Sequence, residues 1–267
     1  MSVAAPLTRF ADAFADRRAD ALPGLMPYFT AGFPTLDATV PLLIAAQEAG
    51  SIAAEVGIPF SDPLADGPTI QRSGRSALRN GMTLRLAVRQ IADARAAGVT
   101  IPLAPMSYVN PILAYGAAAF MADAREAGAD GLIVPDLPAD EADELRGLAH
   151  ARGLALIPLV APTTTEDRLR RICEHAAGFI YCVSVTGVTG AREALAPEGL
   201  QLLDRVRAHT SLPRGLGFGL RSHEHLERLR GHAEAAVVGS ALIDAIEQGG
   251  SDPADAALRF LRAMLGA

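Results

Sequence analysis

The sequence contains no lysine, so all 24 of its basic residues are arginines. An enzyme that forms a Schiff base, including one that binds pyridoxal phosphate (PLP), needs a lysine amine. This chain alone therefore cannot perform either chemistry. Tryptophan is also absent, and only two cysteines occur, Cys173 and Cys182. They form no CxxC pair, which fits a reducing compartment and argues against a redox or metal role.

Long apolar runs and a positive net charge are missing as well. The apolar runs are short and interrupted by proline, as in 154–162, so no segment predicts a membrane span. The first 20 residues lack the apolar core of a signal peptide. The formal net charge of -6 argues against nucleic acid or an anionic membrane as the main partner. Together these absences predict a cytoplasmic protein.

Short apolar segments with strand character alternate with longer amphipathic segments along the chain. Four of the helical segments run up to a glycine, the usual stop signal of a helix: Gly50, Gly98, Gly128 and Gly178. The alternation predicts a parallel sheet, and nearly continuous apolar strands fit burial on both faces. The eight candidate strands are 25–30, 52–56, 101–106, 131–135, 154–159, 178–183, 214–218 and 235–239.

Two α/β architectures fit this pattern, a (β/α)8 TIM barrel and a doubly wound open sheet. Eight units, no GxGxxG after the first strand, and a length of 267 residues favour the barrel, since one barrel commonly uses about 250 residues. We therefore expect residues 1–267 to form a single (β/α)8-barrel domain. An extra N-terminal helix, roughly 6–19, precedes the first strand and is placed to plug the bottom of the barrel.

Two carboxylates are the strongest catalytic candidates. Side chains alternate along a strand, so Ala53, Glu55 and Gly57 share one face. If this face points inward, burial raises the pKa of Glu55 into the range of a general acid or base. The following loop supplies Asp66, the second carboxylate that two-group proton chemistry needs. The alternatives are that Glu55 forms a structural ion pair with an arginine and that Asp66 only shapes a turn.

Three glycine-containing segments are candidates for phosphate binding: 187–190, 217–219 and 239–241. Phosphate binding needs clustered backbone N–H groups and the close approach that glycine permits. The segments follow the last three predicted strands, and the last two loops of a barrel are its usual phosphate site. The alternative is that these glycines only form tight turns.

Two further side chains lie near strand ends. Tyr181 is placed either to reach the active site or to fill the core. Asp136, after the fourth strand, either hydrogen-bonds a substrate or caps the next helix, and the nearby Pro138 favours the cap.

The six histidines do not suggest a metal site. All fall on predicted helices or outer turns, and His223 and His225 are two apart on a helix, so they do not share a face. We therefore expect neither a catalytic metal nor an organic cofactor in this chain.

The segment 55–71, EVGIPFSDPLADGPTIQ, resembles the signature of the tryptophan synthase alpha chain family. The run GIPFSDPLADGP is specific, whereas the glycine loops alone would not be. The resemblance covers nearly the whole chain in order. It continues through the segments 27–34, 108–112, 131–138, 162–169, 181–190, 217–219 and 237–241.

This resemblance implies a TIM-barrel lyase of tryptophan biosynthesis that cleaves indole-3-glycerol phosphate to indole and glyceraldehyde 3-phosphate. It also implies a partner, the PLP-dependent tryptophan synthase beta chain, in an α2β2 heterotetramer. A stand-alone lyase that releases free indole, or a weakly active subunit that mainly activates a partner, would carry the same residues.

Carried over by position, the resemblance makes Glu55 the general acid–base and Asp66 the second acid group, with Tyr181 beside the substrate. Family members bind the substrate through residues that correspond to Tyr28, Ile70, Tyr108, Thr189, Gly190, Phe218, Gly219, Gly239 and Ser240. The chain departs from some relatives at Val185, where they have arginine, and at Tyr28, where they have phenylalanine. Ala104 and Pro105 also interrupt the third strand where aliphatic bulk is expected. None of these departures touches the two carboxylates.

Overall fold

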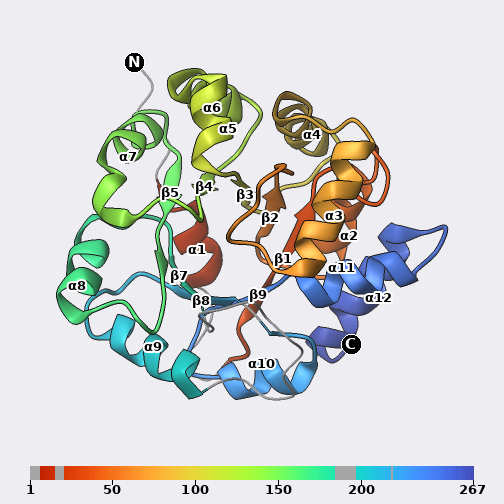
Figure 1. The fold of residues 1–267 in the computed structure, drawn as a ribbon. Coiled ribbons are helices and arrows are strands. Elements are labelled where there is room, and N and C mark those ends of the chain that lie inside the picture. The colour runs from red at the N-terminus through yellow and green to blue at the C-terminus, as the bar shows by residue number, and fades with distance from the viewer. Residues whose placement is uncertain (1–6, 16–20, 184–196, 218) are drawn as a thin grey trace.

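The apolar runs of the sequence form parallel strands that close into a barrel, and helices cover its outside (Figure 1). The computed structural model describes residues 7–15, 21–183, 197–217 and 219–267. The strands found there are β1 (Gly24–Thr30), β2 (Ala54–Gly57), β3 (Leu103–Met106), β4 (Gly131–Ile133), β5 (Ala155–Ile157), β6 (Leu159–Val160), β7 (Ile180–Val183), β8 (Arg214–Gly217) and β9 (Ala235–Val238).

The helices follow the strands in the order expected of a (β/α)8 barrel. They are α1 (Arg9–Ala15), α2 (Thr39–Glu48), α3 (Pro68–Arg79), α4 (Leu84–Ala96), α5 (Val109–Tyr115), α6 (Ala117–Glu126), the 3-10 helix η1 (Ala139–Glu141), α7 (Asp143–His150), α8 (Glu166–His175), α9 (Pro197–Arg207), α10 (His223–Leu229), α11 (Ser240–Gln248) and α12 (Pro253–Leu265).

The barrel closes across a proline. The sheet order is β5-β4-β3-β2-β1-β9-β8-β7-β6. The expected strand at 154–159 is divided at Pro158 into β5 and β6, which stand at the two ends of this order. Proline has no backbone N–H and cannot donate to a ladder, but the Pro158 carbonyl still accepts a hydrogen bond from Tyr181 N at 3.0 Å. Thus β5 pairs with β4, β6 pairs with β7, and the predicted eight-unit barrel is confirmed with one strand in two pieces.

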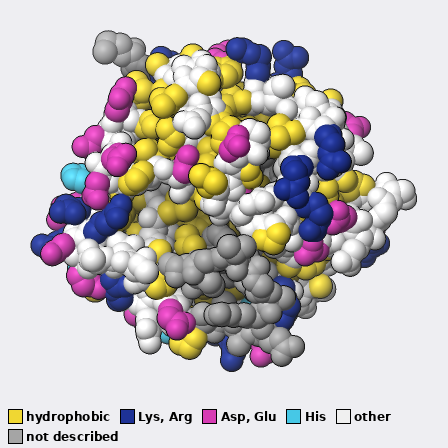
Figure 2. Space-filling view, in the orientation of Figure 1, with side chains coloured by type: hydrophobic (Ala, Val, Ile, Leu, Met, Phe, Trp, Pro, Cys, Tyr) yellow, Lys and Arg dark blue, Asp and Glu magenta, His cyan; other side chains and the backbone are white. Residues whose placement is uncertain are grey.

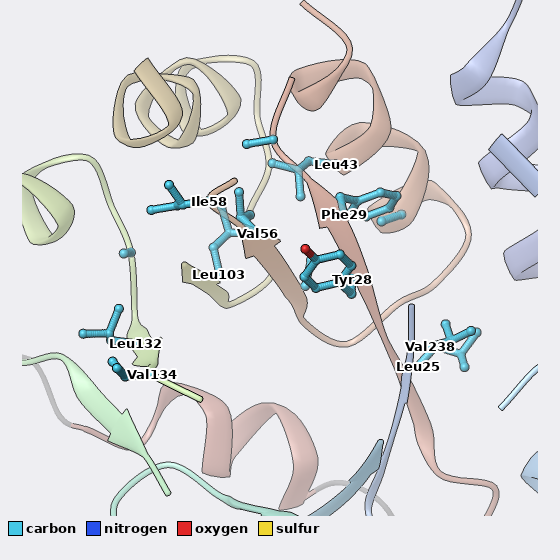
Figure 3. Packing of buried hydrophobic residues seen from close by; sticks show 14 of the residues in the cluster. Leu25, Tyr28, Phe29, Leu43, Val56, Ile58, Leu103, Leu132, Val134 and Val238 are labelled. Atoms are coloured by element: carbon cyan, nitrogen blue, oxygen red, sulfur yellow. The ribbon is translucent and has the colours of Figure 1, made fainter. Parts of the chain in front are cut away.

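Buried side chains form two layers on either side of the strands. Leu25, Phe29 and Val56 belong to the larger cluster, between the strands and the helices, whereas Met26 and Ala53 belong to the cluster inside the barrel. Residues of neighbouring sequence number thus face opposite sides, as strand geometry requires. Figure 3 shows this alternation on β1, where Tyr28 and Phe29 lie on either side of the strand.

Helix α1 lies inside the ring of strands and fills the end of the barrel where the strands begin (Figure 1). The rings of Phe10 and Phe14 are fully buried and pack against Phe179, with centroids 5.6 and 5.1 Å from its ring. Arg9 ties the helix to the buried Asp130, just before β4, at 2.7 Å. The expected plug is therefore confirmed at 9–15, and residues 16–19 of the predicted helix lie outside the described residues.

The glycine stop signals are confirmed for three helices but not for the fourth. Gly50, Gly98 and Gly128 adopt positive φ one residue beyond the C-caps of α2, α4 and α6. Helix α8 instead ends at His175, before Gly178. Gly178 also adopts a positive φ of 78°, and a Cβ there would lie 2.7 Å from the Ile157 side chain, so both the backbone conformation and the packing inside the barrel favour glycine.

Candidate active site

Strand β2 carries Glu55 on its inner face, near the end of the strand. The neighbouring Ala53 belongs to the cluster inside the barrel, whereas Ala54 and Val56 face the helices. Glu55 aligns with Tyr28 of β1 and Ala104 of β3, and it is only 2% exposed. The inward orientation predicted from strand alternation is therefore confirmed.

The Glu55 carboxyl group lies in a poorly solvated environment. Burial raises the pKa of Glu55 to about 8, and the negative charge of Asp66 adds to the rise. No arginine in the described part of the chain pairs with Glu55, and there its Oε2 atom has no hydrogen-bond partner. Within these residues, the alternative of a structural ion pair finds no support.

Asp66 lies beside Glu55 in the loop that joins β2 to α3. Its backbone N donates to Pro63 O at 3.1 Å, and its carbonyl accepts from the Gln71 side chain at 2.9 Å, so both ends of the residue are anchored. Burial raises the pKa of Asp66 to about 6, and a hydrogen bond from the Tyr108 hydroxyl opposes the rise. The loop therefore turns the Asp66 side chain toward the barrel. An aspartate that only shaped a turn would not need this orientation.

Three of the four tyrosines surround the two carboxylates. Tyr108 also accepts a hydrogen bond from Ala65 N at 3.1 Å, which fixes the loop next to Asp66. Burial raises the pKa of Tyr28 and of Tyr181, and the charges of Asp66 and Glu55 add to both shifts. Tyr181 thus both fills the core and reaches the active site, because it belongs to the inner core cluster and also lies near the carboxylates.

Two glycines make room for these tyrosine rings. A Cβ on Gly57 would lie 2.1 Å from the Tyr28 hydroxyl, and one on Gly217 would lie 2.5 Å from the Tyr181 hydroxyl. In Figure 3 the Tyr28 hydroxyl points from β1 toward β2. Each ring therefore lies across a neighbouring strand, at a position where any other residue would collide with it.

Some of the remaining predicted substrate-binding residues lie in the described part of the chain, and others do not. Ile70 lies on α3 and packs against the core, and Gly219 has a φ of +82° with nothing within 4 Å of a Cβ built on it. Gly239 and Ser240 form the N-terminus of α11, where no side chain caps the helix. Thr189, Gly190 and Phe218, and the departure at Val185, lie outside the described residues.

Sequence reasoning missed two hydroxyl groups that support Tyr28. The hydroxyl oxygens of Thr30 and Ser73 lie 2.7 Å apart, and the Thr30 hydroxyl donates to the Tyr28 hydroxyl at 3.3 Å. Thr30 is two residues beyond Tyr28 on one strand face, so strand alternation could have identified it. Ser73 lies on α3, and no sequence signal connects it to β1.

Asp136 caps a helix, but not the one that the sequence suggested. Its carboxylate accepts a hydrogen bond from Val109 N at 3.0 Å, at the start of α5, which precedes it in the chain. The prediction that it caps the next helix is wrong. A sequence pattern can detect a cap only for the helix that directly follows it, whereas this contact joins two loops at the same end of the barrel.

No group of three or more His, Cys, Asp or Glu side chains in the described ranges is placed to hold a metal ion. His223 and His225 lie on α10, on the outside of the barrel, as the sequence predicted. Among the helices described, none is both long enough and apolar enough to cross a membrane.

A parallel barrel with a buried carboxylate, Glu55, near the end of a strand and a partly buried one, Asp66, in the loop that follows defines a (β/α)8-barrel enzyme that uses acid–base chemistry. The model of the tryptophan synthase alpha chain family matches residues 14–264. The chain therefore belongs to the tryptophan synthase alpha chain family, and it is a lyase of tryptophan biosynthesis.

Individual relatives and solved structures agree. The tryptophan synthase alpha chain of Roseiflexus castenholzii is 48% identical over 263 residues, which cover 97% of this chain and 100% of the relative. The alpha subunit structure from Legionella pneumophila matches with a TM-score of 0.86 and 34% identity, over 96% of each chain. A structure from Pyrococcus furiosus, described as the tryptophan synthase α2β2 complex, matches with a TM-score of 0.86 and 38% identity, over 91% of this chain and 98% of that one.

Proposed function

We propose that Glu55 and Asp66 carry out the cleavage of indole-3-glycerol phosphate to indole and glyceraldehyde 3-phosphate. The observation that carries this proposal is the position of the two carboxyl groups: Glu55 is buried on the inner face of β2 with Asp66 beside it, and burial raises the pKa of Glu55 to about 8 and that of Asp66 to about 6. Near pH 7 Glu55 holds a proton while Asp66 is mainly ionised. Two neighbouring carboxyl groups whose surroundings separate their pKa values in this way can act as an acid and an anion in one reaction.

The acid and the anion have distinct tasks. Glu55 donates its proton to ring carbon C3, which turns the indole ring into a positively charged indoleninium. The bond from C3 to the glycerol chain then breaks, and its electron pair returns to the ring. The hydroxyl on the carbon that becomes the aldehyde gives its proton to Glu55, which is thereby regenerated. Asp66, next to the ring N–H, stabilises the positive charge. The steps balance without a metal or an organic cofactor.

The indole ring is proposed to bind among Tyr28, Ile70, Tyr108 and Phe218, with Tyr181 beside the reacting bond. Support comes from the position of Tyr28, Tyr108 and Tyr181, whose pKa values all respond to Asp66. A pocket lined by rings and closed to water strengthens the interactions of both carboxylates with the substrate.

The phosphate is proposed to bind at the start of α11 and in the adjoining loops. The chain has no lysine to offer, so recognition rests on backbone N–H groups, the Ser240 hydroxyl and the positive end of the helix dipole. Ser240 is exposed and Gly239 carries no side chain, so both leave the helix N-terminus accessible. Gly190 and Gly219 would complete the cradle, and Thr189 would lie beside the substrate.

A tryptophan synthase beta chain is the proposed partner, in an α2β2 assembly, and the cytoplasm is the proposed location. Figure 2 shows hydrophobic side chains gathered where Figure 1 places α5, α6 and the ends of β3 and β4. Leu113 on α5 is 57% exposed, and Leu64, in the loop that carries Asp66, is 93% exposed. Exposed apolar side chains near an active-site entrance suit a protein partner. Two free cysteines fit a reducing compartment.

An assay of indole release from indole-3-glycerol phosphate, with and without a beta chain, tests this proposal. We expect slow release by the chain alone and faster turnover with a beta chain. The pH profile of kcat/KM should be bell-shaped, with limbs near the pKa values of Asp66 and Glu55. Full activity alone that no beta chain changes would indicate a stand-alone lyase. No indole release under either condition would refute the proposal.

A further inference from the structure

Asp136 holds the start of a helix that the active site depends on. Helix α5 begins at Val109, and its N-cap residue, Tyr108, makes no capping bond with its own side chain. The Asp136 carboxylate, in the connection after β4, accepts the hydrogen bond from Val109 N at 3.0 Å instead. A carboxylate in this position satisfies a backbone N–H that the helix leaves free and complements the helix dipole.

The residue held in this way reaches Asp66. Tyr108 is 2% exposed, and its ring packs against Phe60 with centroids 5.4 Å apart. Its hydroxyl accepts from Ala65 N at 3.1 Å and donates to the Asp66 carboxylate. Asp136, Tyr108 and Asp66 come from three successive strand-to-helix connections, so the contacts join these connections into one unit.

We propose that Asp136 is a positioning residue for the lyase reaction: by fixing the first turn of α5, it holds the Tyr108 hydroxyl where it can donate to Asp66. The proposal rests on the function proposed above for Asp66. Asp136 lies on the surface and touches neither carboxylate, so it acts only through Tyr108.

The direction of the effect follows from the groups that face Asp66. These are Tyr28 from β1, Glu55 from β2, Tyr108 from the connection after β3, and Tyr181 from β7. Burial raises the pKa of Asp66, and among the described residues it is the bond from Tyr108 that opposes the rise. When Tyr108 moves away, the pKa of Asp66 rises further, and a higher pH is needed to form the anion.

Simple electrostatics predicts the opposite direction. Asp136 faces Tyr108 and adds to the rise in the pKa of that residue. Removing a negative charge from the neighbourhood makes it easier for Asp66 to ionise, so loss of charge alone would move the pKa of Asp66 down. The sign of the shift therefore separates positioning through Tyr108 from a direct effect of charge.

The experiment compares the pH profiles of kcat/KM for indole-3-glycerol phosphate cleavage among variants in the presence of a beta chain. For Asp136→Ala we expect the acid limb to rise by about one pH unit, the size expected for one charge-assisted hydrogen bond. Asp136→Asn, which keeps an acceptor for Val109 N, should return the limb to its original position. Tyr108→Phe should raise the limb at least as far, and adding Asp136→Ala to it should cause no further shift.

Asp140→Ala is the matched control. It removes a carboxylate from the same connection, but one that faces Arg168 and Arg171 of α8, so it should not move the limb. The proposal is overturned if Asp136→Ala leaves the limb in place or lowers it. It is also overturned if the shift persists in full in the Tyr108→Phe background.

A second measurement does not depend on activity. The Ala65 amide is hydrogen-bonded to the Tyr108 hydroxyl, so its hydrogen exchange reports the position of that hydroxyl. Asp136→Ala should accelerate this exchange as Tyr108→Phe does, and Asp140→Ala should not. An unchanged Ala65 amide in Asp136→Ala overturns the positioning even if the protein proves inactive. Conversely, if the wild-type chain with a beta chain releases no indole while Asp136→Ala still accelerates exchange at Ala65, the proposed function of Asp66 is refuted and the contact stands.

Discussion

Replacing Glu55 by glutamine should stabilise the protein while it abolishes the reaction. The folded protein raises the pKa of Glu55 from 4.5 to about 8, so the folded state binds this proton more tightly than the unfolded state does. Below pH 4.5 the group is neutral in both states and costs nothing. As the pH rises from there toward 8, the unfolded chain releases the proton and the folded chain keeps it, so stability falls.

The size of the effect follows from the shift. One pKa unit corresponds to about 1.4 kcal/mol, so wild type should lose about 3 kcal/mol by pH 7 and about 5 kcal/mol above pH 8, relative to pH 4.5. Glutamine has nearly the same shape and never ionises, so the variant escapes this loss. Its stability relative to wild type should therefore increase by about 1.4 kcal/mol per pH unit within this window.

Urea unfolding of wild type and Glu55→Gln at several pH values measures the difference in the free energy of unfolding. The pH dependence of this difference is the informative quantity, because any constant packing cost of the amide cancels. Glu141→Gln is the control, since Glu141 is exposed and solvent screens its charge in both states. A difference between wild type and Glu55→Gln that stays constant from pH 5 to pH 8 would contradict the assignment of Glu55 as a buried acid.

Three further predictions concern the reaction itself. Asp66→Asn should lower kcat for indole release by at least about two orders of magnitude, the low end for a lost acid–base group; near-normal turnover in the folded variant would remove Asp66 from the mechanism. Ser240→Asp should raise KM about tenfold or more, which corresponds to about 1.4 kcal/mol of lost phosphate binding, while thermal unfolding shows α11 undisturbed because a carboxylate suits a helix N-terminus; an unchanged KM would place the phosphate elsewhere. Incubation with EDTA should leave indole release unchanged, and an activity lost to the chelator and restored by zinc would reveal a metal-dependent mechanism.

Most of the barrel could be predicted because its signals are local. Alternation placed Glu55 on the inner face, and the eight apolar runs match the strands that the structure contains. Pro158 was visible inside one of these runs. Its missing N–H explains why this run is divided into β5, which pairs with β4, and β6, which pairs with β7. Pro105 had a milder effect, since β3 persists but aligns with β4 only at Met106.

The part of the site that could not be predicted depends on contacts between distant segments. Ser73 supports Tyr28 from a helix more than 40 residues further along the chain, and Asp136 caps a helix that precedes it. Gly178 shows the same limit, because its role depends on the Ile157 side chain from another strand. A single sequence records which residues have polar or small side chains, but not which of them meet across the barrel.

The packing of the α1 phenylalanine rings has a consequence for small molecules bound inside the barrel. Phe10 and Phe14 close one end of the barrel, and Phe179 lies between them and Tyr181. These packed rings fill the barrel on the α1 side of Tyr181, so a small uncharged product released beside Tyr181 meets closely packed aromatic side chains in that direction. A beta chain bound at the opposite end of the barrel would therefore face the side of the site that these aromatic rings do not fill.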